Sequence, residues 1–403
     1  MTHPEHSLLL LWCVCREVCS HSLSPCQAPT HLTFFTPAAP PGQQVSLVAV
    51  KGTKTILVSA YQEHRTGRRE VSEEGRSPTV PRFTPRGAKY GKRVVNVHSD
   101  HFGFAYGTAD IMCPLPSGCE KKPDHMYLEV KNKKTESDSF HYNFTVCIST
   151  MFDFNNMLQL VQSLETLQLL GVDRVVVYKT SSSPETQQIL DYYTHKGLVE
   201  VIPWTLSRFL NVSRGWLPEH GPGEIHYFGQ IPVLHDCLYR YMYQSRYVAL
   251  HDIDELILPQ KVFRYWSELL PLLEEKYGAK QCFMFQNNVF PNTVTDTRPS
   301  FMPSNWQNVP GVNILTHLYH EPVESGYGDF KIIVNPRAVG SSHLSLFVNV
   351  MSAFCLCRHA KQPKLTQDKL TYDDRLLSYG ARFTPNVSTV LRECGLLQKD
   401  SIQ

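Results

Sequence analysis

One stretch of the chain, residues 246–259, constrains the fold more than any other. An apolar run of β-type residues ends there in Asp252 and Asp254, with Ile253 between them. Side chains alternate between the two faces of a strand, so we expect the two carboxylates to share one face while Ile253 enters the core. Such a pair suits a hard divalent cation that keeps several waters and takes its other ligands from phosphate oxygens. A solvated turn is the plainer interpretation of Asp-Ile-Asp alone, so the surrounding sequence has to decide.

The composition sets the class of protein. The chain has 403 residues, 42% of them apolar, which is enough for a sizeable core. Its formal charge of +2 gives no reason to expect a nucleic acid or an anionic membrane surface as a partner. Twelve cysteines without a Cys-x-x-Cys pair favour secretory-pathway disulfides over a zinc site, and Cys113 and Cys119 could close a small loop. Asn143, Asn211 and Asn386 begin N-glycosylation motifs.

The amino-terminal third divides into two parts. The apolar run at residues 8–14 is far shorter than the roughly 20 residues that a membrane span needs, and Glu5 before it is unlike a signal peptide. We assign residues 1–44 to a short apolar segment and a linker or stem. Residues 45–138 are expected to form a β-rich module, with strands near 45–50, 55–61 and 93–98.

The next part of the chain alternates strands and helices. A strand near 144–149 precedes a helix that Asn156 would cap through Gln159 and that Gly171 would end. A second helix begins at Ser183-Pro184. Further strands are expected at 174–178 and 198–202. This order predicts an α/β domain with a mostly parallel, Rossmann-like sheet, which binds ligands beyond the carboxyl ends of its strands.

The same pattern continues to the carboxyl end of a domain spanning residues 139–397. A loop ending at Gly229 is a candidate lid, and a helix over 230–244 leads into the acidic strand. Pro271 should divide residues 262–273 into two short helices. Strands are expected near 282–285 and 331–334.

Several separated blocks of this sequence resemble glycosyltransferase family 92. They are residues 169–178, 230–238, 247–255, 287–289 and 331–336. Residues 57–61 and 97–104 are also similar to the accessory region that precedes the catalytic domain in animal members. The resemblance implies a single A-type glycosyltransferase domain, preceded here by the smaller β-rich module. It also implies a type II Golgi membrane enzyme that moves galactose from UDP-galactose to a fucose of an N-glycan, with inversion.

The resemblance also assigns roles to particular residues. Asp252 and Asp254 would hold Mn²⁺ or Mg²⁺, with His343 as a further ligand and His359 as its rival. The residues expected to contact the UDP-sugar donor are Tyr178, Gln230, Asp236 and Asp252. The glycan acceptor needs a general base on its hydroxyl, and the candidates are Glu321, Glu324 and Asp329. Glu255 is a further candidate, although its place beside the metal pair favours an orienting role.

Other interpretations remain open. His235-Asp236 and His251-Asp252 could serve a metal phosphohydrolase, but they fall on a helix and on a strand end with no clustered ligands between them. His251 should face away from Asp252 and be structural. Cys237 and Cys282 are expected to be buried thiols or disulfide partners rather than nucleophiles. A catalytically silent nucleotide-sugar- or glycan-binding relative is the other alternative, because residues 340–359 depart from the family pattern.

Overall fold

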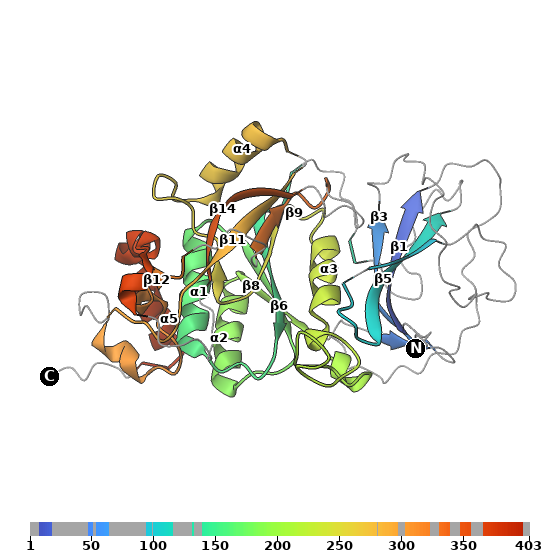
Figure 1. Ribbon diagram of the computed structural model, residues 1–403, viewed down its shortest axis with the longest axis horizontal. Coiled ribbons are helices and arrows are strands. Elements are labelled where there is room, and N and C mark those ends of the chain that lie inside the picture. Colours follow the sequence, from blue (N-terminus) through green and yellow to red (C-terminus); the bar gives the residue numbers. More distant parts are fainter. Residues whose placement is uncertain are drawn as a thin grey trace, which may run out of the picture. The chain divides into compact units, whose positions relative to one another are not determined.

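The computed structural model describes twelve segments of the chain, which form two compact units (Figure 1). The first unit comprises Met1–Glu136 with Thr205–Arg240, and the second comprises Ser137–Trp204 with Tyr241–Gln403. The described residues are 8–17, 47–50, 54–63, 94–98, 100–115, 131–132, 139–279, 281–296, 303–322, 330–338, 347–355 and 366–397.

The described part of the first unit contains a five-stranded sheet in the order β2-β3-β1-β5-β4. Its strands are β1 (Leu8–Glu17), β2 (Val48–Ala49), β3 (Thr55–Glu63), β4 (Val94–Val97) and β5 (Tyr106–Leu115). The first strand pairs in parallel with both β3 and β5. The amino-terminal apolar run, which we placed before the β-rich module, is therefore a strand within its sheet.

Helix α3 (Gln230–Arg240) belongs to the first unit, although the sequence indicated that it led into the catalytic domain. The ring of Tyr239 stacks on that of Tyr61 in β3, with ring centroids 5.4 Å apart. Asp236 accepts a hydrogen bond of 2.6 Å from Ser59 Oγ and forms an ion pair of 2.9 Å with Arg240. These contacts attach the helix to the β-rich module.

The described part of the second unit is built on an eight-stranded sheet in the order β10-β14-β11-β13-β9-β6-β7-β8. Strands β6, β7, β8 and β9 are mutually parallel, and β13 runs against both β9 and β11. The mixed, mainly parallel α/β sheet expected from the sequence is thereby confirmed. The strands are β6 (Tyr142–Met151), β7 (Arg174–Lys179), β8 (Val199–Pro203), β9 (Ser245–His251), β10 (Glu255–Leu256), β11 (Cys282–Val289), β13 (Phe330–Val334) and β14 (Phe347–Cys355).

The first two helices of this unit lie beside one another (Figure 1). Helix α2 (Pro184–His195) begins as predicted, because Ser183 Oγ accepts a hydrogen bond of 3.2 Å from the N–H of Thr186. Helix α1 (Met157–Leu169) ends before Gly171, whose φ of +91° suits a residue without a side chain. The predicted capping by Asn156 is wrong, since its Oδ1 instead accepts a hydrogen bond of 2.8 Å from the N–H of Val312.

The prediction of two short helices around Pro271 is also wrong. One helix, α4 (Trp266–Tyr277), passes through Pro271. Trp266 is fully buried, and its indole N–H donates to the Ile257 carbonyl over 2.9 Å, so tertiary contacts hold the helix in place. Helix α5 (Gly380–Glu393) packs on α1.

Short elements complete the described structure. The two-stranded sheet consists of β12 (Tyr319–His320) and β15 (Thr371–Tyr372). The 3-10 helices span Leu206–Arg208, Tyr227–Gly229, Ser304–Asn308, Ile314–Thr316, Gln367–Lys369 and Arg375–Tyr379. None of the helices in the described part of the chain has the length and hydropathy needed to cross a bilayer.

Candidate active site

The acidic pair lies just beyond the carboxyl end of β9, in a turn rather than in the strand. β9 ends at His251, and the N–H of Glu255 donates to the Asp252 carbonyl over 3.2 Å. The expectation that an extended strand aligns the two carboxylates is therefore wrong. Ile253 is buried in the core as expected, and Asp252 and Asp254 are both partly exposed.

Asp252 is held by side chains from two neighbouring strands. β6 pairs in parallel with β9, with Ile148 opposite His251, so Ser149 reaches Asp252 and its hydroxyl donates to Oδ1. β13 pairs antiparallel with β9 and brings Lys331 Nζ to 3.0 Å from Asp252 Oδ2. The pairing of three strands thus fixes the first carboxylate of the pair.

Glu255 shares the same lysine. Its Oε2 forms an ion pair with Lys331 and accepts a hydrogen bond of 3.2 Å from the N–H of Asp252. Its Oε1 accepts a hydrogen bond of 2.9 Å from the side-chain amide of Asn287 in β11. Glu255 is buried, so these contacts fix its orientation.

The surroundings of Asp252 and Glu255 shift the pKa values of the two carboxyl groups in opposite directions. Burial favours the neutral form of Asp252, but the charge of Lys331 and hydrogen bonds from the surrounding groups hold its pKa well below the usual range. Burial and the neighbouring charge of Asp252 raise the pKa of Glu255 well above its usual range. Asp252 therefore loses its proton at a lower pH than an ordinary aspartic acid, and Glu255 loses its proton at a higher pH than an ordinary glutamic acid.

The donor atoms at this edge fit a hard divalent cation. Asp252 and Asp254 offer carboxylate oxygens, and Asn287 Oδ1 is a buried oxygen without a hydrogen-bond partner among the described residues. No third carboxylate or imidazole of the described segments joins the pair to form a compact three-ligand cluster. Mg²⁺ and Mn²⁺ sites of this kind leave several positions to water and substrate phosphates.

The candidate bases lie in a part of the chain that is only partly described. Glu324 and Asp329 are outside the described residues, as are the candidate ligands His343 and His359. Glu321 is partly exposed, and its N–H donates to the carbonyl of Val289 at the end of β11 over 2.8 Å. Glu321 therefore lies at the same strand end that supplies Asn287.

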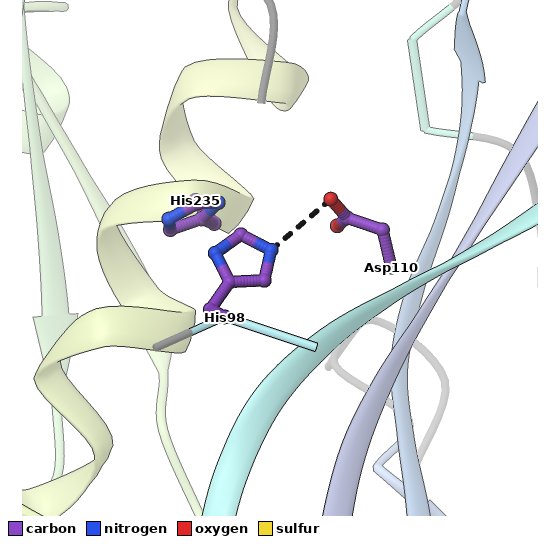
Figure 2. A group of neighbouring side chains, drawn as sticks. All are labelled: His98, Asp110 and His235. Atoms are coloured by element: carbon purple, nitrogen blue, oxygen red, sulfur yellow. Dashed lines mark hydrogen bonds and ion pairs between the residues drawn. The ribbon is translucent and has the colours of Figure 1, made fainter. Parts of the chain in front are cut away.

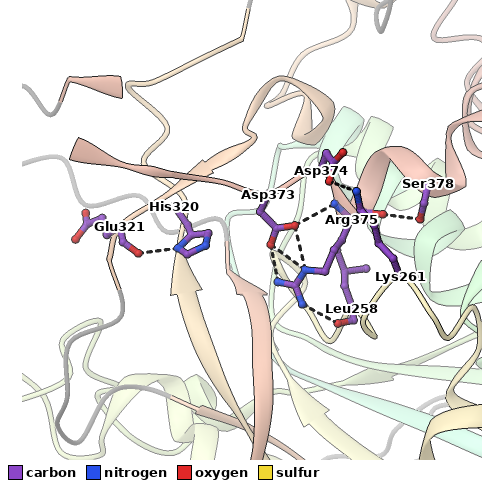
Figure 3. Close-up of polar contacts among 8 residues, drawn as sticks. All are labelled: Leu258, Lys261, His320, Glu321, Asp373, Asp374, Arg375 and Ser378. Atoms are coloured by element: carbon purple, nitrogen blue, oxygen red, sulfur yellow. Dashed lines mark hydrogen bonds and ion pairs between the residues drawn. The ribbon is translucent and has the colours of Figure 1, made fainter. Parts of the chain in front are cut away.

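Ion pairs and hydrogen bonds hold the segments around Glu321 (Figure 3). His320 Nδ1 donates to the Glu321 carbonyl over 2.7 Å, and Arg375 pairs with Asp373. Arg375 also donates to the Leu258 carbonyl over 3.1 Å. Burial favours the neutral form of Asp373, but hydrogen bonds from Arg375 lower its pKa, so it serves as the partner of Arg375.

Three residues expected to contact the nucleotide sugar are buried in other surroundings. Tyr178 is fully buried, with its ring edge-on to Trp204 at a centroid distance of 6.0 Å. Gln230 and Asp236 are buried at the start and middle of α3 in the first unit. Gln230 and Asp236 belong to the first unit, whereas Tyr178 and Asp252 belong to the second, and the ligand contacts of these residues stay predictions.

The structural roles expected for other residues agree with their surroundings. His251 is buried, its Nδ1 donates to the Asp252 carbonyl over 2.9 Å, and burial lowers its pKa to about 4. Cys237 is disulfide-bonded, whereas Cys282 is a buried free thiol whose pKa burial raises to about 12. A thiol of this kind is a poor nucleophile.

Sequence reasoning did not single out Ser149 or Lys331 as site residues. Neither lies near the acidic pair in the sequence, and both reach it only through the lateral order of β6, β9 and β13. A lysine in the middle of an apolar strand was the available signal, because a buried cation needs a carboxylate partner.

The mixed, mainly parallel sheet defines the chain as an α/β protein, and sequence comparisons give the family. The sequence profile of glycosyltransferase family 92 matches residues 142–371, more than half of the chain. The chain belongs to glycosyltransferase family 92.

Individual relatives match over shorter segments. The chain is 30% identical over 131 residues to the glycosyltransferase family 92 protein F13G3.3 of Caenorhabditis elegans, covering 32% of this chain and 25% of that protein. It is 23% identical over 125 residues to the beta-1,4-galactosyltransferase galt-1 of the same organism, covering 30% of this chain and 27% of the relative. The matches thus span about a quarter of the length of these relatives.

One of the solved structures that resemble this chain is glucosyl-3-phosphoglycerate synthase from Mycobacterium tuberculosis, in complex with Mn²⁺, UDP and glucosyl-3-phosphoglycerate. The match covers 64% of this chain and 82% of that one, with 14% identity and a TM-score of 0.26. So low a score adds nothing to the assignment, which depends on the family profile and the observed sheet.

Proposed function

We propose that this protein is a metal-dependent, inverting hexosyltransferase that moves galactose from UDP-galactose to a glycan, with a fucose of an N-glycan as acceptor. The observation that carries the proposal is the acidic turn at residues 252–255, placed at the carboxyl end of β9 within the family 92 segment. Ligands of parallel α/β sheets bind beyond this edge. The name of the galt-1 relative supports galactose as the donor sugar.

The chain's own residues would prepare the site for the diphosphate of the donor. Asp252 and Asp254 would hold a Mn²⁺ or Mg²⁺ ion, with His343 as the further ligand. When bound, the ion supplies positive charge that stabilises the departing diphosphate. Ser149 and Lys331 keep the Asp252 carboxylate ionised and oriented, and Glu255 holds the turn closed by accepting a hydrogen bond from the N–H of Asp252.

Inversion requires a base that removes the proton from the acceptor hydroxyl as the new bond to the sugar forms. Glu255 is unsuited to this step, because it is buried and its carboxyl oxygens are engaged by Lys331, the N–H of Asp252 and the amide of Asn287. Glu321 is partly exposed and lies at the end of β11, beside the strand residue that orients Glu255. We assign the base to Glu321, with Glu324 and Asp329 as the alternatives.

The proposal also concerns the compartment. Cys147 and Cys237 each take part in a disulfide bond, and disulfides persist in the oxidising secretory pathway. This supports an enzyme that acts in the Golgi lumen, where N-glycan acceptors are available.

The test is a transfer assay with purified protein, a panel of radiolabelled UDP-hexoses, Mn²⁺ and a fucosylated N-glycan. The expected result is incorporation of galactose in preference to other hexoses, and its loss in Glu321→Gln with UDP binding retained. Binding of UDP without transfer of any hexose would contradict catalysis and identify a silent relative. Release of phosphate from simple esters would instead indicate the phosphohydrolase.

A further inference from the structure

Three metal-ligating side chains meet inside the first unit (Figure 2). They are His98, directly after β4, Asp110 in β5, and His235 in α3. One ligand atom from each lies within 4.8 Å of the other two. We propose that these residues form a structural zinc site that links α3 to the sheet of the β-rich module.

The spacing of the ligand atoms is close to what zinc requires. Nitrogen and oxygen ligands about 2.1 Å from a tetrahedral ion lie about 3.4 Å from one another. His98 Nε2 and Asp110 Oδ2 are 3.1 Å apart, and the rings of His98 and His235 meet edge to face with centroids 4.4 Å apart. The three ligand atoms, all within 4.8 Å of one another, are therefore near the separation that one ion would impose.

The chemistry of the ligands favours zinc over the ion proposed for the acidic turn. Imidazole nitrogen suits Zn²⁺, whereas Mg²⁺ and Mn²⁺ prefer oxygen ligands. A neutral imidazole carries one unprotonated ring nitrogen, which is the atom that binds a metal. Two histidines and one carboxylate supply three of the four ligands of a tetrahedral zinc ion.

The position of the residues favours a structural role. Side-chain exposures are 8% for His98 and 1% for Asp110, and His235 is 8% exposed, so the ion would be largely shielded from solvent. His98 directly follows β4 and Asp110 lies in β5, which pairs with β4, whereas His235 comes from α3, which is distant in the sequence.

The purified full chain is first dialysed against a chelator, then given Zn²⁺, and then freed of unbound ion. The zinc that remains bound is measured. The expected result is about one zinc per chain in the wild type, with affinity at least about 100-fold lower in His98→Ala and His235→Gln. His195→Gln, which changes an exposed histidine on α2, and Asp252→Asn should both retain the ion. Equal zinc content in wild type and His235→Gln would overturn the proposal, as would a wild type that retains none.

A measurement on the wild type alone covers the case in which the variants do not fold. X-ray absorption of the zinc-loaded protein should show two imidazole ligands, which the carboxylates of the acidic turn could not supply. Zinc should also raise the thermal unfolding midpoint of the wild type, because it binds only the folded unit. An all-oxygen coordination shell, or an unchanged midpoint, would show that His98 and Asp110 form only an ion pair with His235 packed beside it.

Discussion

Lys331 balances the charge of two carboxyl groups at the acidic turn. Its Nζ pairs with both Asp252 and Glu255, and its side chain is only 17% exposed. Proximity to the two carboxylates outweighs burial and raises the pKa of Lys331, so the ammonium persists at all physiological pH values. Without this charge, two acidic groups would be left in a poorly solvated place.

Replacing Lys331 with methionine should therefore destabilise the second unit. Removal of one partner from a buried ion pair costs about 3 kcal/mol or more in the free energy of unfolding. Urea unfolding at neutral pH measures the loss, and Lys331→Arg, which keeps the charge, is the matched control. A Lys331→Met protein as stable as the wild type would show that the lysine does not balance these groups.

His251 makes stability depend on pH. Burial lowers its pKa to about 4 in the folded protein, against about 6.5 in an unfolded chain. The unfolded state therefore binds more protons between these values, so stability is full above pH 6.5 and falls as the pH approaches 4, by up to about 3 kcal/mol. Burial lowers the pKa of His226 and His317 too, so His251 is one of several contributors.

The contribution of His251 is measured by comparing unfolding at several pH values in wild type and His251→Asn. The variant should lose stability less steeply from pH 6.5 to pH 4, because one titrating group has been removed. His195→Asn, at an exposed position, should follow the wild type. Parallel curves for wild type and His251→Asn would contradict the assignment.

The sequence predicted part of this site and not the rest, for a physical reason. Asp252 and Asp254 follow an apolar strand, and that local pattern indicated their place at a sheet edge. Ser149 and Lys331 approach Asp252 only because β6 and β13 flank β9. Local periodicity carries no information about which strands become neighbours, so these contacts required the structure.

At the scale of elements, capping and glycine signals predicted α2 and the end of α1. Pro271, in contrast, led to the wrong prediction that α4 is divided into two short helices. Pro271 lies inside α4 with its side chain exposed, and the helix continues because buried residues on either side of the proline, among them Trp266 and Leu273, anchor it. Tertiary packing here outweighs the loss of one backbone hydrogen bond.

Pro271→Ala should therefore stabilise the second unit. The alanine restores a helical N–H donor and removes the clash of the ring, which together stabilise the folded helix by about 3 kcal/mol. The unfolded chain becomes more flexible without the proline, which lowers the gain in stability by about 1 kcal/mol. Thermal or urea unfolding should show a net gain of about 2 kcal/mol. Glu275→Ala, at an exposed position of the same helix, should change little. No gain in Pro271→Ala would mean that the helix is already adapted to the proline.

At the scale of the whole molecule, strand and helix alternation predicted the α/β class and the place of the acidic turn. It did not predict that β1 enters the sheet of the first unit, nor that Thr205–Arg240 belongs to that unit. Both features depend on pairing between segments that are far apart in the sequence. The family assignment covers the segment that contains the acidic turn, and so it joins the fold to the proposed transfer reaction.

The measurement that tests the central claim most directly is the rate of galactose transfer by wild type and Asp254→Asn, with Mn²⁺ and UDP-galactose held constant. Loss of a carboxylate that holds the ion at the diphosphate should lower the rate at least about 100-fold without changing the fold. Asp191→Asn, which alters an exposed carboxylate on α2, should transfer at the wild-type rate. Transfer by Asp254→Asn at the wild-type rate would contradict the account.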